Sequence, residues 1–117
     1  MITYPATIGG FKTRVIEAGQ GEEVILLVHG LGARADRWRS NINELSSAGY
    51  RVIAFDLPGH GFAEKGPGDH YSVPAFAEMV HAVIAWIGKS KVHLVGTSLG
   101  GPLKVTSLPK IRNAFHL

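Results

Sequence analysis

The residues best suited to chemistry are the five from Gly96 to Gly100, which read Gly-Thr-Ser-Leu-Gly. They follow the short apolar run Val92–Val95, whose β-branched residues favour a strand. A strand that turns sharply into a helix at a G-x-S-x-G pattern leaves the serine hydroxyl exposed at the turn. Glycines two positions either side of Ser98 allow the helix and the strand to approach closely. The pattern therefore predicts a nucleophilic serine at the end of a strand.

The chemistry that this serine would perform is attack on a carbonyl carbon. The backbone N–H of Leu99, in the first turn of the new helix, would point towards negative charge that forms beside Ser98. The alternative interpretation is a glycine-rich turn between a strand and a helix that carries an ordinary surface serine. Motifs elsewhere in the chain are needed to distinguish between these two interpretations.

Composition limits the class of protein. A chain of 117 residues suits one domain with its own core, and a hydrophobic content of 45% argues against disorder. Because there is no cysteine, disulfides, thiolate metal sites and a cysteine nucleophile are excluded. The first five residues lack the features of a signal peptide, and no apolar run approaches the roughly 20 residues that span a membrane. We expect a soluble, cytoplasmic protein with no membrane partner.

The net charge of +3 is not spread over the chain. Residues 1–101 contain nine basic and nine acidic residues, so the excess comes from Lys104, Lys110 and Arg112. A nucleic-acid interface requires a dense basic face. We therefore expect no nucleic-acid partner.

Apolar runs and amphipathic stretches alternate along the chain and indicate the elements that position Ser98. Four strands are predicted, at residues 12–18, 24–28, 52–55 and 92–95. The last three are apolar without alternation, as in strands buried on both faces of a parallel sheet. Helical spacing of apolar residues predicts two helices, the first with Trp38, Ile42 and Leu45 and the second with Phe76, Val80, Val83, Ile84 and Ile87.

Four residues are predicted to begin or end these helices. Asp36 and Ser72 are the expected N-caps, and Gly49 and Gly88 are the expected stops. The resulting order of strand, helix, strand, helix and strand predicts the α/β class, with a doubly wound, mostly parallel sheet.

Three loops follow the carboxyl ends of the three apolar strands, where such sheets place their ligands. They carry the motifs His-Gly-Leu-Gly, Phe-Asp-Leu-Pro-Gly-His-Gly and Val-Gly-Thr-Ser-Leu-Gly-Gly. Together, in this order and within residues 10–101, the motifs resemble the α/β-hydrolase family. The chain is thus interpreted as the N-terminal half of an α/β-hydrolase domain, at residues 1–101, with an atypical tail at residues 102–117.

The resemblance implies a site. Ser98 matches the nucleophile, and the backbone N–H groups of Leu99 and Leu31 match the oxyanion hole. No cofactor and no metal are predicted. His29 and His60 match loop-shaping positions, with a catalytic base as the alternative role, and Asp56 matches a loop-fixing residue rather than the triad acid.

The serine also implies a substrate class. Relatives that open epoxides carry aspartate at the nucleophile position, so Ser98 implies acyl chemistry on a small ester, lactone or thioester, or cleavage of a diketone-like C–C bond. The motifs look most like the branch of the family that contains carboxylesterases and C–C hydrolases.

The chain also departs from the family pattern. The triad follows the order serine, acid, histidine, but no acidic residue follows Glu78, and His116 is the only histidine after Ser98. Pro102 and Pro109 suit a helix after the serine poorly. Two functions therefore remain open, a serine hydrolase represented by its N-terminal half and a truncated, non-catalytic interaction module. A divergent short ending is the alternative to truncation.

The resemblance implies one feature of assembly. In the family's strand order, residues 92–95 lie between residues 24–28 and a later strand, which we expect to be missing from this chain. An unpaired, apolar strand edge recruits other chains. We therefore expect self-association through this edge, as a dimer, an aggregate or a chaperone complex.

Overall fold

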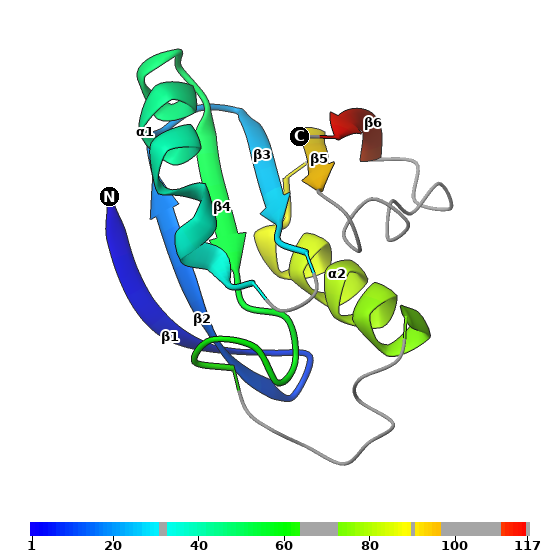
Figure 1. The fold of residues 1–117 in the computed structure, drawn as a ribbon. Coiled ribbons are helices and arrows are strands. Elements are labelled where there is room, and N and C mark those ends of the chain that lie inside the picture. Colours follow the sequence, from blue (N-terminus) through cyan, green and yellow to red (C-terminus); the bar gives the residue numbers. More distant parts are fainter. Residues whose placement is uncertain (31–32, 64–72, 90, 97–110, 117) are drawn as a thin grey trace.

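The computed structural model describes residues 1–30, 33–63, 73–89, 91–96 and 111–116 (Figure 1). Its strands are β1 (Ile2–Ile8), β2 (Phe11–Ala18), β3 (Glu23–Val28), β4 (Arg51–Phe55), β5 (Lys91–Gly96) and β6 (Ile111–His116). Its helices are the 3-10 helix η1 (Ala35–Trp38), α1 (Arg39–Ser47) and α2 (Val73–Ile87). Within these ranges no helix is long and apolar enough to span a membrane.

The strands form one mixed sheet in the order β1-β2-β4-β3-β5-β6. β4, β3, β5 and β6 run parallel to their neighbours in this order, whereas β2 pairs antiparallel with both β1 and β4. The predicted α/β class is confirmed. So is the predicted pairing of residues 24–28 with residues 92–95, which belong to β3 and β5.

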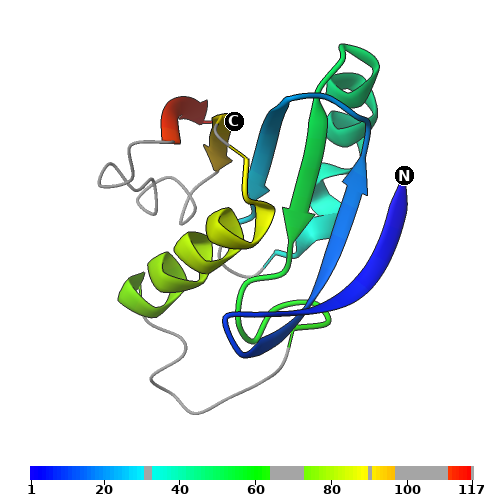
Figure 2. The same ribbon diagram turned by 180° about the vertical axis from the view of Figure 1, so that it is seen from behind.

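Helices cover both faces of this sheet, as Figures 1 and 2 show from opposite sides. Leu26 of β3 packs in the hydrophobic cluster beneath α2. Its neighbour Leu27 packs in the second cluster, with Trp38 and Ile42 of η1 and α1. Because successive side chains of a strand point to opposite faces, a strand buried on both sides must be apolar throughout. This is why β3 has no polar residue between Val24 and Val28.

Helix ends agree with the sequence analysis at their carboxyl sides. Gly49 and Gly88 have φ angles of 101° and 71°, which glycine adopts without strain, and they follow α1 and α2 as predicted. The predicted N-cap role of Asp36 is wrong. Asp36 lies inside η1, after the N-cap residue Arg34, and its carboxylate pairs with arginines instead. The predicted cap at Ser72 lies outside the described residues.

The antiparallel strand β1 was not expected. It forms a hairpin with β2 through Gly9 and Gly10, which have φ angles of 60° and 80°. Pro5 and a largely exposed side-chain pattern hide β1 in the sequence, because an edge strand does not need an apolar run.

The expected open edge of β5 is also wrong. β6 pairs in parallel with β5, from Val92 opposite Ile111 to Gly96 opposite His116, with an irregular register between Leu94 and Gly96. The tail therefore supplies the strand that was expected to be missing. The predicted boundary at residue 101 lies outside the described residues, and self-association of the chain stays a prediction without this edge as its basis.

Candidate active site at the carboxyl edge of the sheet

The predicted site loops leave the sheet from two neighbouring strands. β3 and β5 are parallel and in register, so that Val28 lies opposite Gly96 at their carboxyl ends. His29 follows the first of these residues, and the Gly-Thr-Ser-Leu-Gly pattern begins at the second. The predicted site residues Leu31, Ser98 and Leu99 themselves lie outside the described residues.

His29 is fully buried beside this edge. Its Nδ1 lies 2.8 Å from the carbonyl oxygen of Gly30, and its Nε2 lies 2.9 Å from the amide nitrogen of Leu57. Because a carbonyl only accepts, Nδ1 carries the proton, and Nε2 accepts the Leu57 N–H. Burial lowers the pKa of His29 below its usual 6.5. His29 therefore joins the loop after β3 to the loop after β4. Because both of its nitrogens form hydrogen bonds, it has no lone pair left to accept a proton from a serine.

His60 holds the loop after β4 against α2. Its Nδ1–H donates to the carbonyl of Pro58 at 3.0 Å. The centroid of its ring lies 5.0 Å from that of the His29 ring and 5.9 Å from that of the Phe76 ring, which it meets edge-on. These contacts agree with the loop-shaping role that the resemblance implies for His60.

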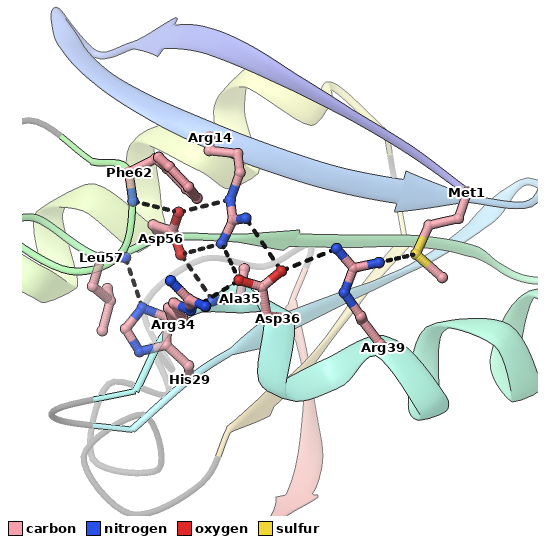
Figure 3. Close-up of polar contacts among 10 residues, drawn as sticks. All are labelled: Met1, Arg14, His29, Arg34, Ala35, Asp36, Arg39, Asp56, Leu57 and Phe62. Atoms are coloured by element: carbon pink, nitrogen blue, oxygen red, sulfur yellow. Dashed lines mark hydrogen bonds and ion pairs between the residues drawn. The ribbon is translucent and has the colours of Figure 1, made fainter.

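Asp56 is fully buried at the end of β4. Its carboxylate accepts hydrogen bonds from the Arg14 guanidinium and from the backbone N–H groups of Ala35 and Phe62 (Figure 3). Gly61 has no side chain because a Cβ there would lie 2.5 Å from an Asp56 carboxylate oxygen. Both carboxylate oxygens of Asp56 thus accept hydrogen bonds that fix the surrounding loops, which agrees with the role that the resemblance implies.

The ion pair between two charged residues of this edge, Arg14 and Asp36, was not predicted from the sequence. Hydrogen bonds from Arg14 are the main cause that lowers the pKa of Asp36 below its usual 3.8. Burial alone would lower the pKa of Arg14, but its hydrogen bonds to Asp56 and Asp36 raise it. The sequence feature that could have indicated this ion pair is the single arginine in β2, directly before the buried residues Val15 and Ile16.

The described residues hold no candidate metal centre. Among the described residues, no three histidine, aspartate or glutamate side chains lie together in a way that could hold a metal ion. The side chains of Arg14, Asp56, His29 and His60 are paired with one another or with backbone groups, which suits them to fix loops.

Comparison with known proteins identifies what this arrangement is similar to. Residues 23–106 match the family model described as the alpha/beta hydrolase fold. The 2-hydroxy-6-oxononadienedioate/2-hydroxy-6-oxononatrienedioate hydrolase of Escherichia coli K12 is 36% identical over 88 residues, which cover 73% of this chain and 31% of that enzyme.

Solved structures give a similar result. An epoxide hydrolase from Vigna radiata superposes with a TM-score of 0.81 at 32% identity, over 87% of this chain and 33% of its own. A membrane phospholipase A, described as a bacterial virulence factor, has a TM-score of 0.79 at 33% identity, with 87% and 33% coverage. The chain spans about a third of the length of these relatives. The family model matches more than half of the chain, and the chain belongs to the α/β-hydrolase family.

Proposed function

We propose that this chain carries the nucleophile and the oxyanion hole of a serine hydrolase. Ser98 is the nucleophile, and the backbone N–H groups of Leu99 and Leu31 stabilise the oxyanion. The observation that carries the proposal is the register of β3 and β5, in which Val28 lies opposite Gly96. The segments that contain Leu31 and Ser98 therefore start from adjacent points on the carboxyl edge of the sheet, where this type of sheet binds its ligands.

The proposed chemistry is acyl transfer through Ser98. The Ser98 Oγ attacks a carbonyl carbon while a base takes its proton, and the carbonyl oxygen becomes an oxyanion. Each backbone N–H that donates to this oxyanion contributes about 3 kcal/mol to the stabilisation of the transition state. The tetrahedral intermediate then expels its leaving group, which takes a proton, and water hydrolyses the acyl–serine ester to release the acid.

The proposed substrate is a small ester, lactone or thioester, or a diketone-like compound whose C–C bond is cleaved. The Escherichia coli relative, named for the hydrolysis of a hydroxy-oxo-dioate, supports the last of these classes. Ser98 argues against the epoxide chemistry named for the Vigna radiata neighbour, because epoxide-opening relatives use an aspartate nucleophile. The proposed substrate class is therefore inferred from Ser98, and not from the names of the structural neighbours.

These 117 residues provide little help for proton transfer to and from Ser98. The sequence contains no acidic residue after Glu78, and both nitrogens of His29 are engaged in hydrogen bonds. We therefore expect these 117 residues on their own to react slowly, with the roughly 10³–10⁴-fold advantage over water that an oxyanion hole and binding provide without a triad. A non-catalytic interaction module is the second candidate function.

A fluorophosphonate probe tests the proposal, because it forms a covalent bond faster with a serine hydroxyl beside an oxyanion hole than with an ordinary surface serine. The expected result is slow, stoichiometric labelling, located at Ser98 by mass spectrometry and lost in Ser98→Ala. The matched control is Ser46→Ala, which removes a half-buried serine of α1 and should label normally. Absence of labelling in the wild-type chain would reject the serine-hydrolase proposal in favour of the interaction module.

Turnover of p-nitrophenyl acetate tests the expected rate. We expect little hydrolysis by the wild-type chain and little change in Ser98→Ala. A clear burst that Ser98→Ala abolishes would show a fully activated serine, and the base would then have to be sought at His60 or His116.

A further inference from the structure

A buried arginine on β2 connects the segment after β3 with the loop after β4. Arg14 is only 8% exposed, although it lies in a strand and carries a full charge. Figure 3 shows its guanidinium between two carboxylates, those of Asp56 and Asp36. Burying a charge in this way is costly unless paired, hydrogen-bonded partners compensate for it. A cation in this position therefore requires a structural or functional explanation.

The geometry of the contacts is that of a double fork. Arg14 Nε and Nη2 donate to the two oxygens of Asp56 at 2.9 and 3.1 Å. Arg14 Nη1 and Nη2 donate to the two oxygens of Asp36 at 3.2 and 3.0 Å. Two bidentate pairs on one planar group fix the orientation of both carboxylates. A lysine at this position would keep the charge but could not form either fork.

The Asp56 carboxylate, oriented by Arg14, also fixes the position of two backbone N–H groups. It accepts the N–H of Ala35 at 2.8 Å and the N–H of Phe62 at 3.1 Å. His29, at the other end of the 29–35 segment, is tied to the same β4 loop by the Leu57 N–H. The segment that contains Leu31 is therefore fastened to the loop after β4 at both of its ends.

Asp56 depends on Arg14 more than Asp36 does. Asp36 also pairs with Arg34 at 3.0 Å and with Arg39 at 3.2 Å, and its side chain is 21% exposed. Asp56 is fully buried, and in the described part of the chain Arg14 is its ion-pair partner. The centroid of the Phe62 ring lies 4.6 Å from the guanidinium carbon of Arg14, so the ring covers Arg14 from one side. Without Arg14, a buried carboxylate would lose its counter-ion.

We infer that Arg14 is a positioning residue for the oxyanion hole, because its forked pairs with Asp56 and Asp36 hold the segment that carries the Leu31 N–H. The inference rests on the proposed function for what the segment does, and on the hydrogen bonds above for how it is held. Arg14 reaches the site through Asp56 and the backbone N–H of Ala35, and it takes no part in bond making or breaking.

Three variants separate this role from a general contribution to stability. Arg14→Met removes the charge and both forks, Arg14→Lys keeps the charge alone, and Arg51→Met is the matched control. Arg51 is a part-buried arginine on β4 that pairs with Glu17 at 3.2 Å. It has the same charge in the same sheet, but it is not among the partners of Asp56.

Amide hydrogen exchange, followed by two-dimensional NMR, measures how firmly the segment is held. In Arg14→Lys, and more strongly in Arg14→Met, the amides of Ala35 and Phe62 should exchange at least tenfold faster relative to core amides such as that of Val83. Arg51→Met should leave this ratio unchanged. An equal acceleration of all amides, or no change at Ala35 and Phe62 in Arg14→Lys, would overturn the inference. Arg14→Lys keeps the experiment decisive if Arg14→Met does not fold.

The rate of fluorophosphonate labelling at Ser98 then tests the functional part. We expect labelling to slow about tenfold in Arg14→Lys under conditions where the variant is fully folded, and to stay unchanged in Arg51→Met. Faster exchange at Ala35 with an unchanged labelling rate would make Arg14 a purely structural residue and contradict the inference. If the wild-type chain is not labelled at all, the proposed function fails, while the exchange of the two amides still decides whether Arg14 holds the segment.

Discussion

The two faces of the sheet are held together by different kinds of contact. The cluster beneath α2 consists of apolar side chains from every strand from β1 to β5, packed on residues such as Phe76 and Val80. The face beneath η1 and α1 has a smaller apolar cluster around Trp38. At its carboxyl edge lies the ion cluster of Arg14, Asp36 and Asp56.

This difference affects how each face responds to change. Apolar packing depends on volume and pattern, and it tolerates small shifts of its members. An ion cluster depends on direction, because each donor must meet its acceptor and an unmatched buried charge is costly. The α2 face is therefore suited to support the sheet, and the edge beside η1 is suited to fix loops in one geometry.

The largest effect is expected at the ion cluster. Asp56→Ala removes the acceptor of Ala35 and Phe62 and leaves Arg14 with Asp36 as its remaining carboxylate partner in Figure 3. Loss of one partner from a buried pair costs about 3–5 kcal/mol. Urea unfolding, followed by circular dichroism, should show a decrease of this size in the free energy of unfolding. A decrease below about 1 kcal/mol would mean that the Asp56 contacts contribute little, since exposed ion pairs have values of that size.

The second prediction concerns the apolar face. Leu26→Ala should decrease the free energy of unfolding by about 2–5 kcal/mol, because it leaves a cavity beneath α2. The hydrogen exchange of the Ala35 and Phe62 amides, relative to other amides, should stay unchanged. Leu27→Ala, the neighbouring fully buried leucine on the other face, is the matched control for residue size. A selective acceleration at Ala35 in Leu26→Ala would show that the two faces are not independent.

The third prediction is a dependence on pH that arises from His29. Burial lowers the pKa of His29 in the folded chain, so the unfolded chain binds a proton at higher pH than the folded chain does. The stabilising effect of neutral His29 is therefore complete above its usual pKa of 6.5 and is lost as the pH falls through the lowered pKa. His60, Asp56 and Arg14 are the charged or titratable groups that act on it.

His29→Gln removes this titration and should flatten the dependence of unfolding free energy on pH below 6.5. Urea unfolding of both proteins at several pH values between about 4.5 and 8 measures the difference, in which the contributions of the other histidines cancel. Parallel curves for the two proteins would show that His29 is not buried in its neutral form.

Part of this molecule could be predicted from the sequence because the signals were local. The apolar runs of β3, β4 and β5 and the helical spacing of Phe76, Val80 and Val83 reflect burial of consecutive residues. The parallel pairing of β3 with β5 was implied by the resemblance to the α/β-hydrolase family, which rests on the motifs at the ends of these strands. Gly49 and Gly88 ended helices as expected, because a positive φ angle is a local requirement.

The rest depended on partners that are distant in sequence. Arg14 and Asp56 are 42 residues apart, and Arg14 and Asp36 are 22 apart, so no periodicity links them. Asp36 resembled a helix cap because its local surroundings suit one, but three arginines compete for its carboxylate. β6 was missed because residues such as Arg112 and Asn113 leave it without an apolar run, and because its partner β5 is distant in the sequence.

The smallest effect is expected at the exposed arm of the same ion cluster. The Arg34 side chain is 58% exposed and pairs with Asp36 at 3.0 Å. Because exposed ion pairs are screened by water and salt, Arg34→Ala should change the free energy of unfolding by about 1 kcal/mol or less. Asp36 keeps Arg14 and Arg39, so the fork that orients it survives the substitution. Urea unfolding at low and high salt is the measurement, and the small effect should shrink further as salt rises. A loss of about 2 kcal/mol or more, insensitive to salt, would require Arg34 to be part of the buried fork. The contrast between the buried and exposed arginines would then fail, and Arg14 would not be distinguished by its burial.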